Sequence, residues 1–80
     1  MQTTKPVIAT KIEANDNDLV IHISGNLVRI PWDKCSATLA KASPEARKTA
    51  KLSPGGYGIH WPELDEDLSV GGLVAANKTT

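Results

Sequence analysis

Two short runs of alternating apolar and polar residues, 18–24 and 27–31, flank Gly25 and Asn26. Alternation with period two is typical of strands that bury one face, and a two-residue loop that begins with glycine favours a β-hairpin. Pairing across this loop places Ile21 opposite Ile30 and gathers the apolar side chains on one face. A slip of one residue would mix the two faces, so the pattern predicts a hairpin.

Residues 6–13 form a further predicted strand, with Ile8, Thr10 and Ile12 on one side. Short Asn and Asp side chains bond their own backbone and favour turns, so residues 14–17 are expected to connect this strand to the hairpin. The three strands together predict a small antiparallel sheet.

After the hairpin the spacing of apolar residues becomes helical. Asp33 is expected to cap a short helix over 33–41. Ser43 is expected to cap a second helix over 44–51, with Pro44 at its first position, where a missing N–H is tolerated.

The C-terminal third contains a predicted short strand over 57–61, which Pro62 would end at a sheet edge. Ser69 is expected to cap a last helix over 70–76, and residues 77–80 are expected to fray. The predicted fold class is therefore α+β: a small antiparallel sheet packed with short helices.

A chain of 80 residues accommodates one small domain, with an ordered core expected over 6–76. Its 40% hydrophobic and 22% charged residues are typical of a globular protein. No apolar run approaches the roughly 18 residues of a membrane span, and Cys35 has no second cysteine to pair with. We expect a cytoplasmic protein.

The net charge is zero but unevenly distributed. Residues 1–51 hold eight of the nine Lys and Arg against five acids, a net charge of +3, whereas residues 52–76 hold four acids and no base. Strong nonspecific binding to nucleic acid normally requires an excess of cations, so this balance argues against it.

The acids of the second half are concentrated between 63 and 67, beside aromatic residues. A solvated acidic ridge of this kind could dock a basic protein, because charge steers association. The competing interpretation is negative charge ahead of the last helix. Trp61 is either a core anchor or an exposed contact, whereas the hairpin register places Trp32 in the core. The candidate partner-binding residues are Tyr57, His60, Trp61, Glu63, Asp65, Glu66 and Asp67.

No catalytic constellation is evident. Cys35 is interpreted as a small structural hydrophobe, and His22 as a surface residue of the hairpin. His60 with the nearby carboxylates lacks the second His or Cys of a zinc site and the glycine spacing of a calcium loop. Glycines 55, 56 and 58 lack the Lys-Ser/Thr ending of a phosphate loop. We expect no enzyme activity, no metal and no cofactor.

A second hypothesis is a small nucleic-acid-binding transcriptional regulator. It would use a modest basic strip, although such runs are usually solvated helix faces. The candidate residues are Arg29, Lys41, Arg47, Lys48 and Lys51. Self-association is a further alternative, because exposed strand edges near Pro6 or Pro62 could pair between chains.

The sequence also resembles a known family. The run Ala42–Arg47, and above all Gly58-Ile59-His60-Trp61-Pro62-Glu63-Leu64-Asp65-Glu66-Asp67, is similar to the small bacterial proteins grouped as domain of unknown function 2442. This resemblance implies a compact α+β domain and a partner role in toxin–antitoxin type gene pairs. It transfers no catalytic residue. The leading expectation is a noncatalytic protein-interaction module, antitoxin-like or an adaptor.

Overall fold

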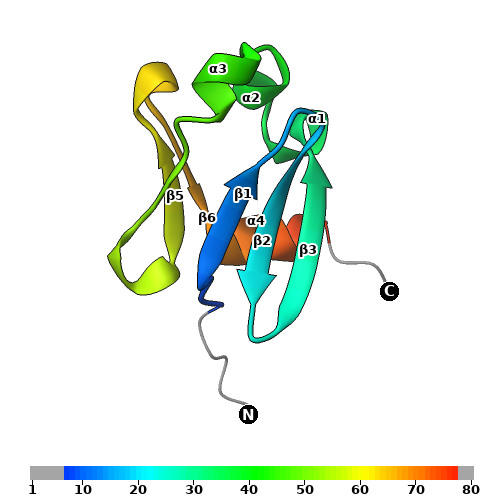
Figure 1. Ribbon diagram of the computed structural model, residues 1–80, viewed down its shortest axis with the longest axis vertical. Coiled ribbons are helices and arrows are strands. Elements are labelled where there is room, and N and C mark those ends of the chain that lie inside the picture. Colours follow the sequence, from blue (N-terminus) through cyan, green and yellow to red (C-terminus); the bar gives the residue numbers. More distant parts are fainter. Residues whose placement is uncertain (1–6, 78–80) are drawn as a thin grey trace.

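The computed structural model describes residues 7–77 and contains two antiparallel sheets of three strands each (Figure 1). The first sheet has the order β1-β2-β3, formed by Lys11–Ala14, Asp18–Ile23 and Asn26–Pro31. The second has the order β4-β5-β6, formed by Lys51–Leu52, Gly58–Trp61 and Glu66–Ser69. The α+β class is confirmed, but β4, β6 and hence the second sheet were not predicted.

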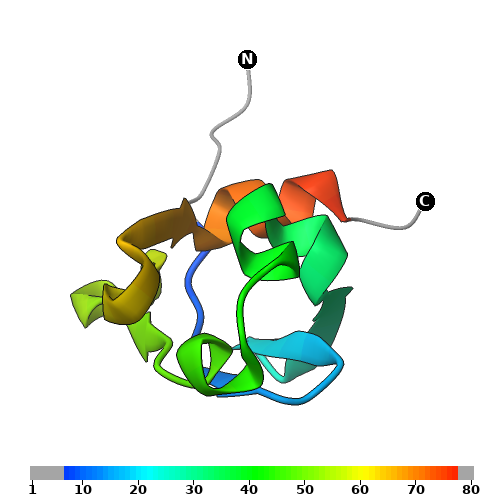
Figure 2. The same cartoon turned by 90° about the horizontal axis from the view of Figure 1, so that it is seen from above.

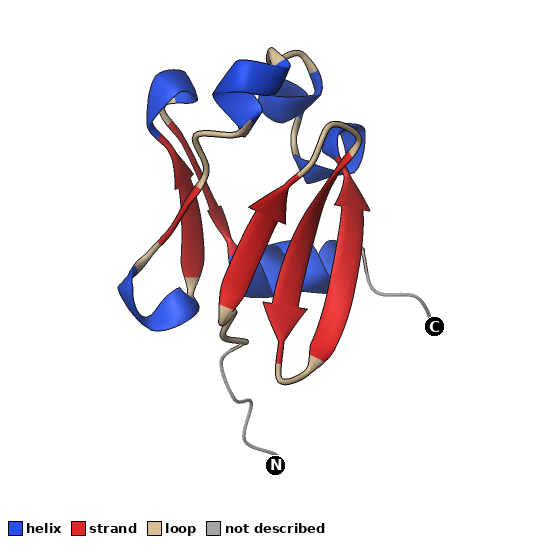
Figure 3. Cartoon of the chain, in the orientation of Figure 1, coloured by secondary structure: helices blue, strands red, loops and turns tan. Residues whose placement is uncertain are grey.

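Short helical segments connect or follow these strands (Figure 3). The α-helices of the described chain are α1 (Trp32–Cys35), α2 (Ala37–Ala40), α3 (Pro44–Arg47) and α4 (Val70–Ala76). Two 3₁₀ turns, η1 (Pro54–Gly56) and η2 (Pro62–Leu64), lie at the two ends of β5. The segment α1–α3 connects the two sheets, and α4 runs behind the first sheet (Figure 1, Figure 2).

The hairpin of β2 and β3 is present, but its predicted register is wrong by two residues. Ile21 lies opposite Val28 rather than Ile30, and the turn is Ser24-Gly25. Both turn residues have positive φ, 47° and 82°, as a type I′ turn requires. Because side chains alternate with period two, a two-residue shift leaves every residue on its predicted face.

The other pairs that the wrong register implied also change. His22 lies opposite Leu27, and Arg29 lies opposite Val20. Trp32 has no strand partner, because it begins α1. The predicted strand over 6–13 is shorter and later in the structure, Lys11–Ala14, and residue 6 lies outside the described residues.

The predicted helix over 33–41 is broken in two. Ser36 adopts an extended conformation between α1 and α2, and its hydroxyl accepts a hydrogen bond from the N–H of Leu39. Asp33 lies in the first turn of α1 and does not cap it. A serine that bonds the backbone locally competes with helical continuation, which explains the break.

The two later caps agree with the sequence. Ser43 accepts a hydrogen bond from the N–H of Ala46, and Ser69 accepts one from the N–H of Gly72. The last helix has its predicted bounds, but α3 ends at Arg47 rather than near Lys51, which belongs to β4. Asn77 is not frayed: its backbone and side chain both donate to the carbonyl of Leu73. Residues 78–80 lie outside the described part.

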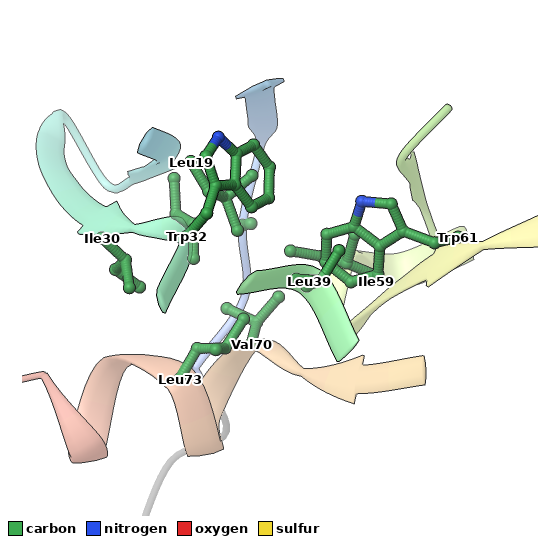
Figure 4. Close-up of a cluster of buried hydrophobic side chains, with 10 residues drawn as sticks. Leu19, Ile30, Trp32, Leu39, Ile59, Trp61, Val70 and Leu73 are labelled. Carbon is green, nitrogen blue, oxygen red and sulfur yellow. The ribbon is translucent and has the colours of Figure 1, made fainter. Parts of the chain in front are cut away.

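The core lies between the two sheets, α2 and α4 (Figure 4). Trp32 and Trp61 meet edge to face, with ring centroids 6.4 Å apart and an interplanar angle of 81°. Such pairs contribute about 0.5–1.5 kcal/mol beyond burial of their area. The buried residues that surround them include Leu19, Ile21, Ile30, Leu39, Ile59, Val70 and Leu73.

Gly56 joins the N-terminal segment to the second sheet. Its carbonyl accepts a hydrogen bond from the N–H of Ala9 at 2.8 Å. A Cβ at this position would lie 2.2 Å from the carbonyl oxygen of Ala9, and φ is +78°. Only glycine fits both this contact and this conformation.

Candidate functional site

The outer face of the second sheet carries a row of three polar side chains. Lys51, His60 and Asp67 lie opposite one another on β4, β5 and β6. Nδ1 of His60 lies 2.7 Å from Oδ1 of Asp67. Alternate residues of β5, Ile59 and Trp61, point the other way into the core.

Two further candidates lie at opposite ends of this sheet. Tyr57 precedes β5, and half of its surface is exposed. Glu63 and Asp65 lie at the other end, in the connection from β5 to β6, and both are exposed. Because β5 spans four residues, roughly 13 Å, the run that is contiguous in sequence is spread along the sheet rather than gathered in one patch.

Trp61 is not part of this surface. Its side chain is fully buried, and its indole N–H donates to the carbonyl of Arg47 at 3.1 Å. Of its two interpretations, the core anchor is confirmed. Glu66 lies opposite Trp61 and shares its side of the sheet, where it is half-buried. The two residues therefore do not belong with the other candidates.

The interpretation of the acidic run as charge ahead of a helix is wrong. Glu66 and Asp67 are the first two residues of β6, and the rest of that strand lies between them and α4. Asp65 adopts a left-handed conformation, with φ of 50°, at the end of η2. Short Asp side chains tolerate this conformation, so Asp65 is suited to the turn that lets β6 pair with β5.

The acids of the described chain differ in whether they have an ion-pair partner within it. In the first half, Nε2 of His22 lies 2.5 Å from Glu13, Lys48 lies 3.4 Å from Asp16 and Arg29 lies 3.6 Å from Asp18. In the second half of the described chain, only Asp67 is paired, with His60. No ion pair within residues 7–77 involves the remaining acids, Asp33, Glu45, Glu63, Asp65 and Glu66. Of these, Glu63 and Asp65 lie together at one end of the second sheet, and both are exposed.

The predicted basic strip is not continuous. Its members lie on β3, on β4 and at the ends of α2 and α3. Arg47 is used internally: Nε donates to the carbonyl of Leu39 at 2.9 Å and Nη2 to that of Ala40 at 3.0 Å. Its guanidinium also lies 5.4 Å from the ring centroid of Trp32. Arg29 and Lys48 are ion-paired, whereas Lys41 and Lys51 are exposed.

The outer face of the first sheet holds a pair that the sequence did not predict. His22 and Glu13 come from neighbouring strands and form a hydrogen bond across them. This bond lowers the pKa of Glu13 below its usual value, because it favours the ionised carboxylate. Glu13 and His22 are nine residues apart, and no local sequence pattern indicates that they meet. Only the register of β1 against β2 brings them together.

Cys35 lines an open groove of about 220 Å³ between α1 and the β6–α4 segment. Burial raises the pKa of its thiol to about 11. A thiol with this pKa is a poor nucleophile at neutral pH, in agreement with the structural role expected for it. Among residues 7–77, no three His, Cys, Asp or Glu side chains are placed to hold a metal ion.

A family model described as Protein of unknown function (DUF2442) matches residues 9–79. The chain belongs to this family. The resemblance seen in the Gly58–Asp67 run is thereby confirmed over nearly the whole sequence. No curated protein matches the chain.

Two solved structures resemble this member of the DUF2442 family. A protein of unknown function from Rhodospirillum rubrum is 26% identical, with a TM-score of 0.80 over 95% of this chain and 94% of its own. An uncharacterized protein from Chromobacterium violaceum is 20% identical, with a TM-score of 0.71 over 91% of this chain and 69% of its own. The second likeness shows the fold alone. Within the described residues, no helix is long and apolar enough to cross a membrane.

Proposed function

We propose that this protein is a noncatalytic interaction module that docks a basic protein partner through the second sheet. The docking surface consists of Tyr57, His60, Glu63, Asp65 and Asp67. The family resemblance favours an antitoxin-like or adaptor role in a toxin–antitoxin type gene pair, with a toxin as the partner and the cytoplasm as the compartment.

The observation that supports this proposal is that two exposed carboxylates without an ion pair among residues 7–77, Glu63 and Asp65, lie together in the connection from β5 to β6. Glu13, Asp16 and Asp18 each have a cationic or imidazole partner within the chain. Glu63 and Asp65 are exposed, and neither has such a partner among residues 7–77. A cationic partner would therefore meet carboxylates that are not already neutralised.

Tyr57 adds an apolar contact to this charge. Tyrosine is enriched where binding energy is concentrated, because it buries a large ring and keeps a polar hydroxyl. It lies at the opposite end of the sheet from Glu63, so a partner that touches both would also cover His60 and Asp67. No observation favours the nucleic-acid alternative, since Arg47 is engaged inside the protein.

The test is affinity capture from lysate of the native host, followed by titration calorimetry with the captured protein. The variant is Glu63→Gln with Asp65→Asn, because asparagine also tolerates the left-handed conformation of residue 65. The matched control is Asp33→Asn with Glu45→Gln, which removes two exposed acids from other parts of the surface. Circular dichroism verifies that each variant is folded.

The proposal predicts that the variant weakens binding by about fivefold in Kd at low salt, since two exposed ion pairs are worth about 1 kcal/mol. The control should bind like the wild type, and the difference should shrink at high salt. Equal binding by variant and control would reject the docking surface. Capture of nucleic acid, with steeply salt-dependent binding, would instead favour the regulator.

A further inference from the structure

The first sheet has one open edge within the described structure. On one side of β2, β1 lies against β4 of the second sheet. On the other side of β2, β3 is the last strand of the sheet. Nothing in the described chain pairs with the outer edge of β3 (Figure 1). An open edge exposes unpaired N–H and C=O groups that can bond another strand.

The hairpin register identifies which groups these are. In a hairpin with a two-residue turn, the flanking residues Ile23 and Asn26 form a hydrogen-bonded pair, and such pairs then alternate. The backbone of Val28 therefore bonds β2, whereas the N–H and C=O groups of Leu27 and Arg29 point away from the sheet. No hydrogen bond among residues 7–77 uses these outward groups.

We propose that two copies of this chain pair antiparallel through β3, with the two-fold axis at Val28. This register places Leu27 of each copy opposite Arg29 of the other, so the two-fold axis gives two equivalent pairs. Both residues present outward N–H and C=O groups, so the edge is complementary to itself and each pair exchanges backbone hydrogen bonds. The two first sheets become one continuous sheet.

Side chains favour this register over its neighbours. Leu27 is 53% exposed, the most exposed of the large hydrophobic side chains in the described structure, and the stem of Arg29 from the other copy would cover it. A register shifted by two residues in one direction would place the two Arg29 side chains opposite each other, which is destabilising. A shift the other way would place Arg29 opposite the Ser24-Gly25 turn, where pairing ends.

The charge of Arg29 does not prevent pairing. Its guanidinium lies 3.6 Å from Asp18 of the same copy, so each arginine brings its own counter-ion. This dimer uses the first sheet and is independent of the docking surface proposed for the second. Failure of either proposal leaves the other unchanged.

The first test measures the mass of the intact chain by light scattering across a range of concentrations. The wild type should reach twice the 8.5 kDa mass of one chain. Leu27→Pro removes an outward N–H without removing a bond to β2, so it should be monomeric. Leu27→Val keeps that N–H and should remain dimeric. A wild type that is monomeric throughout would overturn the proposal.

A second test fixes the register and does not depend on the proline variant folding. In a Cys35→Ala background, Val28→Cys places two thiols across the two-fold axis, about 4.5 Å apart at Cα, and should cross-link under mild oxidation. Leu27→Cys is the matched control: its two thiols lie on a diagonal, about 7–8 Å apart, and should cross-link far less. If the Val28→Cys variant were dimeric but did not cross-link, the dimer would use another surface, and the proposal would be wrong.

Discussion

The indole N–H of Trp61 donates a hydrogen bond to the backbone carbonyl of Arg47 across 3.1 Å. This bond links the central strand of the second sheet to α3. The side chain of Arg47 in turn bonds two carbonyls of α2 and lies over the ring of Trp32. The two residues thus connect the second sheet to α2 and to Trp32 at the start of α1.

We predict that Trp61→Phe lowers the free energy of unfolding by about 2–3 kcal/mol. Phenylalanine leaves the carbonyl of Arg47 without this donor and does not fill the space of the indole. Urea denaturation measures the change. Tyr57→Phe, at an exposed position, is the control and should change stability by less than about 0.5 kcal/mol. If Trp61→Phe and Tyr57→Phe changed the free energy of unfolding equally, the buried hydrogen bond of Trp61 would contribute nothing to stability.

Arg47→Lys should cost about 1–2 kcal/mol although it preserves the charge. Lysine cannot present two N–H groups to the carbonyls of Leu39 and Ala40 while lying flat over Trp32. Thermal and urea unfolding measure the loss. Lys41→Ala, which removes an exposed cation at the end of α2, should have little effect. A neutral result at position 47 would show that its charge alone matters.

Glu13 should titrate below 4.5, the usual value for its carboxyl group, because the hydrogen bond from His22 lowers its pKa. A lowered pKa stabilises the folded state above the unfolded pKa, and this contribution is lost as pH falls through the folded pKa. An NMR titration of the Glu13 carboxyl carbon in His22→Gln should show the pKa rising toward 4.5.

The His60→Gln variant, altered on the other sheet, is the control for that titration. It should leave the pKa of Glu13 unchanged. The same upward shift in both histidine variants would contradict the pairing of Glu13 with His22.

Ser24→Asn should stabilise the protein by about 0.5 kcal/mol. Ser24 has a positive φ of 47° at the first position of a type I′ turn, where Asn before Gly is preferred. Gly25→Ala should destabilise it by about 1 kcal/mol, because φ at position 25 is +82°. Chemical denaturation measures both. If Ser24→Asn were destabilising while Asn26→Gly stabilised the fold, the turn at Gly25-Asn26 would be the better description.

Local signals in the sequence were sufficient where neighbouring residues decide the structure. The caps at Ser43 and Ser69 are local: each serine hydroxyl accepts a hydrogen bond from the backbone N–H three residues later in the chain. The two faces of the hairpin depend only on alternation, so they were correct even with the wrong register. The run Gly58–Asp67 was specific enough to identify the family.

Long-range pairing was not visible in the same way. The two residues of β4 carry no strand pattern of their own and are extended because they pair with β5. The acids of β6 are poor strand formers, and their pairing with β5, Glu66 with Trp61 and Asp67 with His60, holds them in a strand. The hydrogen bond of His22 to Glu13 likewise depends on the register of β1 against β2.

By itself, the sequence determined the fold class, the hairpin and its faces, the last helix and the family. The tertiary structure alone decided that Trp61 is buried, that Arg47 is occupied inside the protein, and that Glu63 and Asp65 remain unpaired among residues 7–77. Caps and alternation act over a few residues. Burial and ion pairing depend on which distant segments meet, and this is decided only when the two sheets enclose a common core.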